Sequence, residues 1–488
     1  MGPRAFHFLL HCCLLFLLAV ATIGYRHWAF AGDGLHNYSM FRNILAGLGA
    51  WSDPWYEYFL GNRAMLTAHL LILPFIALFR TPLVLIYSGI ACWYAAALLA
   101  YHSARTVLAS EKLAGLSAAI FFTTPIVMQL SLPGQQTFNA DEFLAPAILL
   151  LFCGLLNRSR LWYFLSIALI TLTTEESQVW LPLILITEIA WYRLLRGEIW
   201  LSKKDLLATA VLYLVLCAVS WNILWHYRAL NIFNVAPHAT QPFSSLLSAL
   251  SHWKPGAWAA LRLGASSLPL LAWLLAFGGL PASIVALSGH LLFLFGRLAV
   301  DLILYGRTQS LFWHSHVLVA PMIFLAGLSG LGIGAKVAAN PRTFSILRGL
   351  LIGTLALNLL LNIGYGTDPF RYAWRLRQDW PLTRAQRAQM NAILAAIPEP
   401  ETPGEVIVAA EHCAIPFLYK RSALDPNEWL ALRKDPRYDR ARRDPRYGDL
   451  VRYAVLRKAE TSPEDLKNYY DGFSVILETE DYLALKRR

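Results

Sequence analysis

The sequence is poor in charged residues and in cysteine. Charged residues make up 15% of its 488 residues and hydrophobic residues 57%, a balance that excludes an ordinary soluble domain. Of the six cysteines, five lie in apolar runs and Cys413 alone lies in the polar C-terminal part. A disulfide framework is therefore excluded there, and no CxxC or similar metal-binding spacing occurs.

Long apolar runs recur instead from residue 8 to residue 366. A helix needs roughly 20 such residues to cross a hydrocarbon layer of about 30 Å, so we predict a polytopic α-helical membrane protein. Arg4, the apolar run Phe8–Gly24 and the segment Ala29–Ala31 resemble a cleaved signal peptide. The length of the run and the spans that follow favour an uncleaved first span.

About eleven transmembrane helices fit the sequence. We expect them at about 8–30, 83–101, 113–132, 143–156, 161–174, 178–194 and 206–225, twice within 266–305, and at 316–334 and 346–366. The topology of 266–316 stays open. In the outer loop 31–82, the apolar stretch Leu66–Phe79 is too short to cross, which predicts helices that lie in the membrane interface.

Charge alternates between the connections of these spans. Basic residues occupy every second loop, which indicates that the N-terminus and these basic loops lie on the cytoplasmic side. The basic residues include Arg105, Lys112, Arg158, Arg160, Arg193, Arg196, Lys203, Lys204, Lys336, Arg342 and Arg348. The net charge of +11 then reflects orientation in the membrane, and we expect no nucleic-acid partner.

From residue 367 the composition becomes polar and mixed in charge. Strands are predicted at 405–410 and 450–456, a hairpin or long strand at 473–485, and a helix at 383–396. We therefore expect two domains: a transmembrane domain, 1–366, and a small extracytoplasmic α/β domain, 367–488.

Twelve acidic residues precede residue 367, and seven of them fall on the predicted outer side. Carboxylates are costly near a bilayer, so a cluster that converges from several helix ends predicts a functional site. The seven are Asp33, Asp53, Glu57, Asp141, Glu142, Glu175 and Glu176.

These acidic residues also have structural interpretations. Asp33 could cap an interfacial helix, and Asp141 and Glu142 begin a predicted span, where the helix dipole favours them. Glu175 and Glu176 close a predicted span, where the dipole is unfavourable, so we expect a cation, a metal or a shared proton to stabilise this pair.

Three histidines are weaker candidates. His69, His314 and His316 fall near the predicted membrane interface, where a lone histidine is more often a hydrogen-bonded packing residue than a ligand. The spacing of His314 and His316 would direct both side chains to one side only on a strand.

The overall pattern resembles the GT-C superfamily of polytopic glycosyltransferases, which use polyprenyl-phosphate-linked sugars as donors. Three segments carry the resemblance: His69-Leu70-Leu71-Ile72, Phe138-Asn139-Ala140-Asp141 and Thr174-Glu175-Glu176. They are similar to a bacterial family of predicted membrane proteins that has His-Phe-Ser-Pro, Phe-His-Pro before an acidic residue, and Lys-Glu-Asp at these places. This chain keeps the histidine of the first segment, the phenylalanine and the acidic position of the second, and a glutamate followed by an acidic residue in the third. It differs from the family at the other positions.

The resemblance implies an inner-membrane enzyme with a polyprenyl-phosphate sugar donor and a lipid, glycan or protein acceptor. Asp33 would be the general base. Asp141, Glu142, Glu175 and Glu176, together with His69, would bind substrate, and the acidic residues could hold a divalent cation. Candidates to neutralise the departing phosphate are Arg63, Arg228, Arg307, His314 and His316.

Two other functions are compatible with the sequence. A lipid-linked-sugar flippase or other transporter could use outer carboxylates to bind a solute or relay protons; within the predicted spans it would have Glu188 and Asp301. A non-catalytic membrane assembly protein could use the C-terminal domain to recruit partners.

Overall fold

The fold is described from a computed structural model of the chain. The described residues are 2–26, 33–46, 66–124, 127–128, 140–228, 319–337, 341–365, 383–398, 406–409, 422–424, 429 and 451–488.

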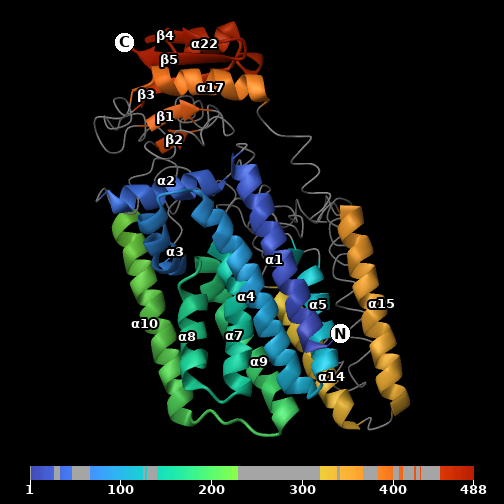
Figure 1. The fold of residues 1–488 in the computed structure, drawn as a ribbon. Helices are drawn as coiled ribbons and strands as arrows, with labels where there is room; N and C mark the ends of the chain where they lie inside the picture. The colour runs from blue at the N-terminus through green and yellow to red at the C-terminus, as the bar shows by residue number, and fades with distance from the viewer. Residues whose placement is uncertain are drawn as a thin grey trace, which may run out of the picture.

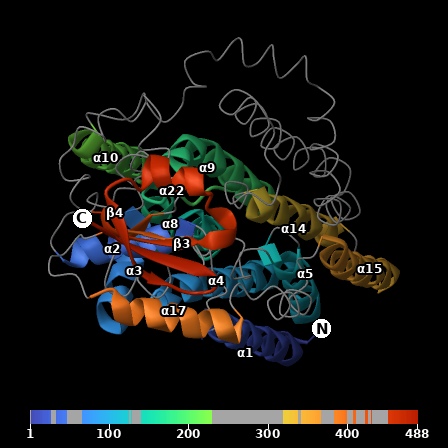
Figure 2. The ribbon, with the colours of Figure 1, turned by 90° about the horizontal axis from the view of Figure 1, so that it is seen from above.

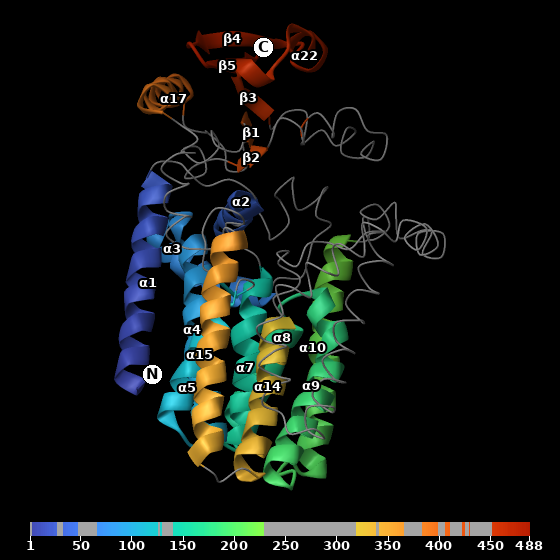
Figure 3. The ribbon, with the colours of Figure 1, turned by 90° about the vertical axis from the view of Figure 1, so that its right-hand side faces the viewer.

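The described part of residues 2–365 is a bundle of antiparallel helices (Figures 1 and 3). Its long and short helices are α1 (Pro3–Arg26), α4 (Leu83–Leu108), α5 (Glu111–Thr123), α7 (Leu144–Leu156), α8 (Arg160–Thr171), α9 (Glu175–Arg196), α10 (Lys203–Arg228), α14 (Val319–Val337) and α15 (Pro341–Tyr365).

Two of the described helices, α1 and α4, are long and apolar enough to cross a membrane. They pack antiparallel: the rings of Phe6 and Tyr101 stack with centroids 4.6 Å apart, and the hydroxyls of Thr22 and Tyr87 lie 2.6 Å apart. Most of the other predicted spans that fall on described residues form helices within about five residues of their predicted bounds, but the span predicted at 113–132 does not: α5 ends at Thr123. The count of eleven stays a prediction, because the two passes within 266–305 lie outside the described residues.

The basic turns gather at one end of the bundle. Nε1 of Trp200 donates to the carbonyl oxygen of Leu155 over 3.0 Å, which brings the α9–α10 turn to the α7–α8 turn. A β-carbon at Gly332 of α14 would touch side chains of Val107 and Leu195, near the ends of α4 and α9. We call this end, where α4, α7, α9 and α14 finish, the basic end.

Two further helices lie at the opposite end. Helix α2 (Asp33–Leu45) lies across the bundle (Figure 1), and α3 (Leu66–Phe79) has the bounds expected of the short apolar stretch. Helix α3 contacts both α2 and α4. The hydroxyl of Thr81, after α3, lies 3.4 Å from that of Tyr25 in the last turn of α1, so α1 ends here and α4 begins here.

The C-terminal residues form a five-stranded mixed sheet in the order β2-β1-β3-β5-β4. The strands are β1 (Val406–Ala409), β2 (Ser422–Leu424), β3 (Val451–Arg457), β4 (Phe473–Glu478) and β5 (Tyr482–Arg487). Strands β1, β2 and β3 pair in parallel, and the hairpin β4–β5 adds antiparallel to β3. The predicted strands at 405–410 and 450–456 and the predicted hairpin are confirmed.

Two helices accompany this sheet. Helix α17 (Arg384–Ala396) begins with a capping box between Thr383 and Gln386; the side chain of Gln389 donates to Asp481 and accepts from its backbone N–H, beside β5. Helix α22 (Pro463–Tyr469) precedes β4. Seen from above, the sheet lies over the bundle (Figure 2), and β2 contacts α2, so this domain lies at the end opposite the basic turns.

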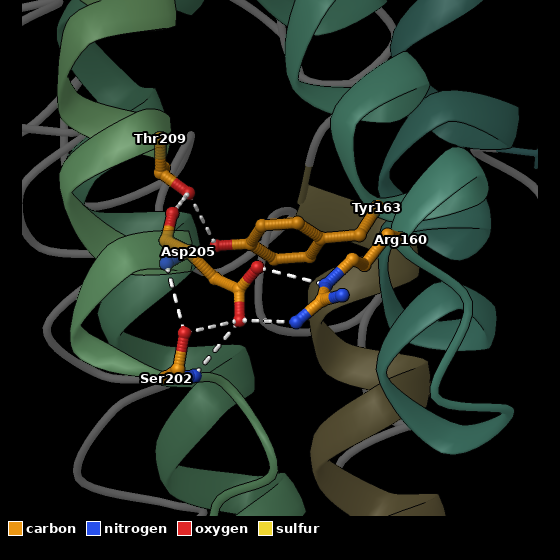
Figure 4. A network of polar contacts seen from close by, with 5 residues as sticks. All are labelled: Arg160, Tyr163, Ser202, Asp205 and Thr209. Carbon is orange, nitrogen blue, oxygen red and sulfur yellow. Dashed lines mark hydrogen bonds and ion pairs between the residues drawn. The ribbon is translucent and has the colours of Figure 1, made fainter.

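A polar network joins α8 to α10 at the basic end (Figure 4). Nε and Nη2 of Arg160 donate to the two carboxylate oxygens of Asp205 over 2.8 and 3.2 Å. Ser202 caps α10: its hydroxyl and its backbone N–H both donate to Asp205. The hydroxyls of Tyr163 and Thr209 lie 3.1 Å apart one turn further in. Because the Asp205 side chain is 9% exposed, this pair is shielded from solvent on one side.

The hydrogen bonds from Arg160 and Ser202 hold the pKa of the Asp205 carboxyl at about 2, below its ordinary value of 3.8. Asp205 lies in the first turn of α10, ahead of the apolar stretch 206–225. Since its folded-state pKa lies below the unfolded one, the carboxylate stabilises the fold fully above about pH 4 and loses that contribution as the pH falls toward about 2.

We therefore expect Asp205→Asn to lower the thermal unfolding midpoint at neutral pH and to flatten its decline between about pH 4 and pH 2. Tryptophan fluorescence of the purified protein measures both effects. Glu198→Gln is the matched control, because it removes an exposed ion pair with Arg158 that contributes little. An identical pH dependence in Asp205→Asn and the wild type would contradict this account.

Candidate functional site

Three of the segments that carry the predicted acidic residues start at the end opposite the basic turns. Asp33 is the first residue of α2, Asp141 and Glu142 lie in the 3-10 turn η2 (Ala140–Phe143), and Glu175 and Glu176 begin α9. We call this the acidic end. The side chains of Asp33, Asp141, Glu175 and Glu176 lie outside the described part of the structure, so their convergence rests on backbone positions.

Helix α3 connects these segments. The hydroxyl of Thr67 donates to the carbonyl oxygen of Leu169 over 2.9 Å, and the Thr67 backbone N–H donates to that of Leu172 over 3.0 Å. These bonds fix the start of α3 to the end of α8, three to six residues before the start of α9. Since α3 also contacts α2 and η2, it joins all three acidic segments. His69 lies on α3, and its side chain is not among those described.

Glu142 is the acidic candidate whose side chain the structure places. It is 5% exposed and fits against Gly89 of α4: a β-carbon at Gly89 would lie 2.7 Å from its Oε2. A β-carbon at this position would displace the end of the Glu142 side chain. The absence of a side chain at Gly89 of α4 therefore leaves the space that the buried Glu142 side chain occupies at the acidic end.

The prediction that Glu175 and Glu176 close a span is wrong. The preceding helix, α8, ends at Thr171, and α9 begins at Glu175 behind a capping box between Thr174 and Ser177. The pair lies in the first turn of α9, where the helix dipole favours negative charge. The argument that a cation must stabilise the pair therefore fails.

The remaining candidates fall mostly outside the described residues. Arg63, Arg307, His314 and His316 lie there, and so do Asp53 and Glu57. Arg228 is the last residue of α10, and its side chain is not described. Within the described part of the chain, no three His, Cys, Asp or Glu residues are grouped so that they could hold a metal ion. The divalent cation stays a prediction.

An apolar groove opens beside Glu142. It has a volume of about 710 Å³ and runs between α3, α4 and α7, with Phe143 and Cys92 adjoining Glu142 and its Gly89 seat. Its lining comprises Leu71, Ile72, Phe75, Phe79, Thr81, Leu83, Val84, Tyr87, Ser88, Ala91, Cys92, Ala95, Leu99, Phe143, Pro146, Ala147, Leu150 and Leu169. The sequence analysis did not identify this groove, which three separate helices build.

Two arginines at the acidic end also escaped that analysis. Arg26 is the last residue of α1, and Arg80 follows α3 in the left-handed conformation, with φ of 49°. The bond between Tyr25 and Thr81 places the two close to the start of the groove. Both are exposed, and neither forms an ion pair with any described residue. Their position opposite the basic turns is the signal that could have identified them.

Among known proteins, a solved structure resembles this chain in its fold. The structure matches the crystal structure of ArnT from Cupriavidus metallidurans bound to undecaprenyl phosphate with a TM-score of 0.53, covering 96% of this chain and 97% of that chain. The chain has an ArnT-like fold. Sequence identity to ArnT is 12%, so the likeness concerns the fold alone. No protein-family model matches the sequence, and no curated protein sequence matches it.

The seat of Glu142 gives a direct test. In Gly89→Ala the new β-carbon displaces the carboxylate, while a helical glycine replaced by alanine gains about 0.5–1 kcal/mol of stability. We expect an unchanged or raised unfolding midpoint together with faster amide hydrogen exchange in residues 140–145. Gly349→Ala is the control, since a β-carbon there meets nothing within 4 Å. Unchanged exchange in both variants would show that Glu142 does not depend on Gly89.

Proposed function

We propose that the protein is a GT-C-type membrane glycosyltransferase that moves a sugar from a polyprenyl-phosphate donor to an acceptor. One observation carries the proposal: three segments that begin with acidic residues start at the same end of an ArnT-like bundle. ArnT is itself a GT-C glycosyltransferase and was solved with undecaprenyl phosphate bound. The apolar groove beside Glu142 supports a lipid-linked substrate.

The proposed setting is the inner membrane, with several spans and a cytoplasmic N-terminus. The gathering of basic turns at one end supports this orientation, because such loops stay on the cytoplasmic side. The acidic end and the domain 367–488 then lie on the outer face, where that domain would help to select a lipid, glycan or protein acceptor. The boundary between a transmembrane domain, 1–366, and an extracytoplasmic domain, 367–488, is part of this proposal.

Asp33 is proposed as the general base. The acceptor hydroxyl oxygen attacks the anomeric carbon of the donor sugar, the bond from that carbon to the phosphate oxygen breaks, and the hydroxyl proton passes to the Asp33 carboxylate. Polyprenyl phosphate departs with the bonding electron pair. The start of α2 suits this role, since it places the residue at the acidic end.

The other candidates would bind substrate. Glu142, Asp141, Glu175, Glu176 and His69 would orient sugar hydroxyls, or the acids would hold a divalent ion through oxygen ligands. Cations stabilise the departing phosphate by charge-assisted hydrogen bonds; those proposed are Arg63, Arg228, Arg307, His314 and His316.

Asp33→Asn tests the base. Removing a general base lowers the rate by roughly 10²–10⁴-fold, so we expect the release of polyprenyl phosphate from a panel of polyprenyl-phosphate sugars to fall by that factor. Mass spectrometry of purified protein in nanodiscs, supplied with acceptor extract, measures the release. Glu198→Gln, at the basic end, is the control and should keep its activity. Near-normal turnover in Asp33→Asn would remove Asp33 from the mechanism.

A transporter is the second candidate, because of Glu188. This residue lies in α9, is 0% exposed, and neither of its carboxylate oxygens has a hydrogen-bond partner among the described residues. Acidic residues buried within spans often bind ions or relay protons. Asp301, the other acidic residue expected in a span, lies outside the described residues. Our proposal gives Glu188 no part in the transfer.

We therefore expect Glu188→Met to stabilise the protein and leave sugar transfer intact. Removing a buried polar group that has no partner saves about 1–3 kcal/mol of desolvation cost, and methionine keeps the length of the side chain. Thermal unfolding and the polyprenyl phosphate release assay measure the two effects. Loss of transport of a lipid-linked sugar in vesicles, with no transfer in any variant, would instead support the transporter.

A further inference from the structure

Helix α9 contains a proline about two turns after its acidic start. Pro182 has no backbone N–H, and in an α-helix that group would donate to the carbonyl oxygen four residues earlier, which belongs to Gln178. The hydroxyl of Tyr213 in α10 donates to this carbonyl oxygen over 2.9 Å. A side chain of α10 therefore supplies the hydrogen-bond donor that the proline removes from α9.

The side chain of Gln178 makes a second link to α10. Gln178 is 3% exposed. Its Nε2 donates to the carbonyl oxygen of Thr171 at the end of α8 over 3.0 Å, and to the hydroxyl of Ser220 in α10 over 2.9 Å. Ser220 and Tyr213 lie seven residues apart, which places them on one face of α10. The backbone and the side chain of one residue thus bind the start of α9 to the same face of α10.

These links lie close to the acidic pair, because Gln178 follows Glu176 by two residues. The capping box between Thr174 and Ser177 sets the shape of the first turn of α9, and the hydroxyl of Ser177 also bonds to the carbonyl oxygen of Ile170 in α8. Gln178 adds α10 as a second neighbour that fixes this turn. A proline weakens the continuity of a helix, so the place of the first turn in the bundle depends on such links.

We propose that Tyr213 is a positioning residue: through Gln178 it holds the first turn of α9, and with it the backbone of Glu175 and Glu176, in place against α10. The proposal rests on the proposed function, in which this pair orients sugar hydroxyls. It adds a residue on another helix that acts through the backbone of α9, without touching substrate. Ser220 supports the same turn through the side chain of Gln178.

Two variants each remove one link and change little side-chain volume. Tyr213→Phe removes the donor to the Gln178 carbonyl oxygen, and Ser220→Ala removes an acceptor of the Gln178 side chain. We expect each to raise the KM for the polyprenyl-phosphate sugar donor about three- to tenfold, the range that one net hydrogen bond supplies, and to change kcat by less than about twofold. A variant that only lost folded protein would show lower turnover at an unchanged KM.

Tyr163→Phe is the matched control. The hydroxyl of Tyr163 also meets α10, 3.1 Å from that of Thr209, but it does so at the basic end. Its loss removes a contact between the same kinds of groups far from the acidic pair. We expect the KM for donor to stay within about twofold of the wild-type value in this variant.

Pro182→Ala separates positioning from mere satisfaction of the carbonyl group. In the double variant Tyr213→Phe, Pro182→Ala, α9 regains an N–H for the Gln178 carbonyl oxygen, but the link to α10 stays absent. Hydrogen exchange of the amides in 176–181 should be faster in Tyr213→Phe and return to the wild-type rate in the double variant, while the KM for donor stays raised. Pro182→Ala alone is the reference, since a carbonyl oxygen accepts two donors.

A wild-type KM in both Tyr213→Phe and Ser220→Ala would overturn the proposal. So would a KM that returns to the wild-type value in the double variant, because Tyr213 would then only satisfy a carbonyl group. The proposed function fails separately, if the wild type releases no polyprenyl phosphate from any donor. The exchange rates need no turnover, and unchanged exchange in Tyr213→Phe would show that Tyr213 does not hold the start of α9.

Discussion

The cost of placing charge among apolar helices is the constraint on which this architecture depends. Most of the described charged residues of the bundle lie at helix ends: the basic turns gather at one end, and the segments that carry Asp33, Asp141, Glu142, Glu175 and Glu176 start at the other. Where an acid does enter the bundle, the fold accommodates it: Asp205 pairs with Arg160 and caps α10 through Ser202, and Glu142 fits into space that Gly89 leaves. Glu188 is the exception, with no described hydrogen-bond partner.

Helix α3 connects the segments that form the candidate site. It is too short to cross a bilayer, and the two bonds from Thr67 fix its start to the end of α8. From there it contacts α2 and η2 and forms one wall of the apolar groove. A single short helix thus joins the acidic segments to a surface suited to a hydrocarbon chain, which is the arrangement that a lipid-linked sugar needs.

Local features of the structure could be predicted from the sequence. The bounds of α3, the capped start of α17 at Thr383 and the strands β1 and β3 follow from hydrophobic runs and turn residues that lie next to each other in the chain. The start of α9 was missed because apolar residues flank Glu175 and Glu176 on both sides. The signal was present in Thr174 and Ser177, which form a capping box.

Features that depend on several helices could not be predicted in this way. The seat of Glu142 needs the register between η2 and α4, and the groove needs three helices whose separation no local pattern specifies. The nearness of Arg26 to Arg80 depends on a contact between Tyr25 and Thr81, which are 56 residues apart in the chain. The roles given to Asp33, Asp141, Glu175 and Glu176 rest on backbone positions and stay predictions.

A cryo-EM structure of the protein with a non-hydrolysable polyprenyl-phosphate sugar would test the central claim most directly. Our account predicts the sugar at the acidic end, within hydrogen-bond distance of Asp33, with the chain of the lipid along α4. A sugar bound in the middle of the bundle near Glu188, or on the C-terminal domain away from α2, would contradict it.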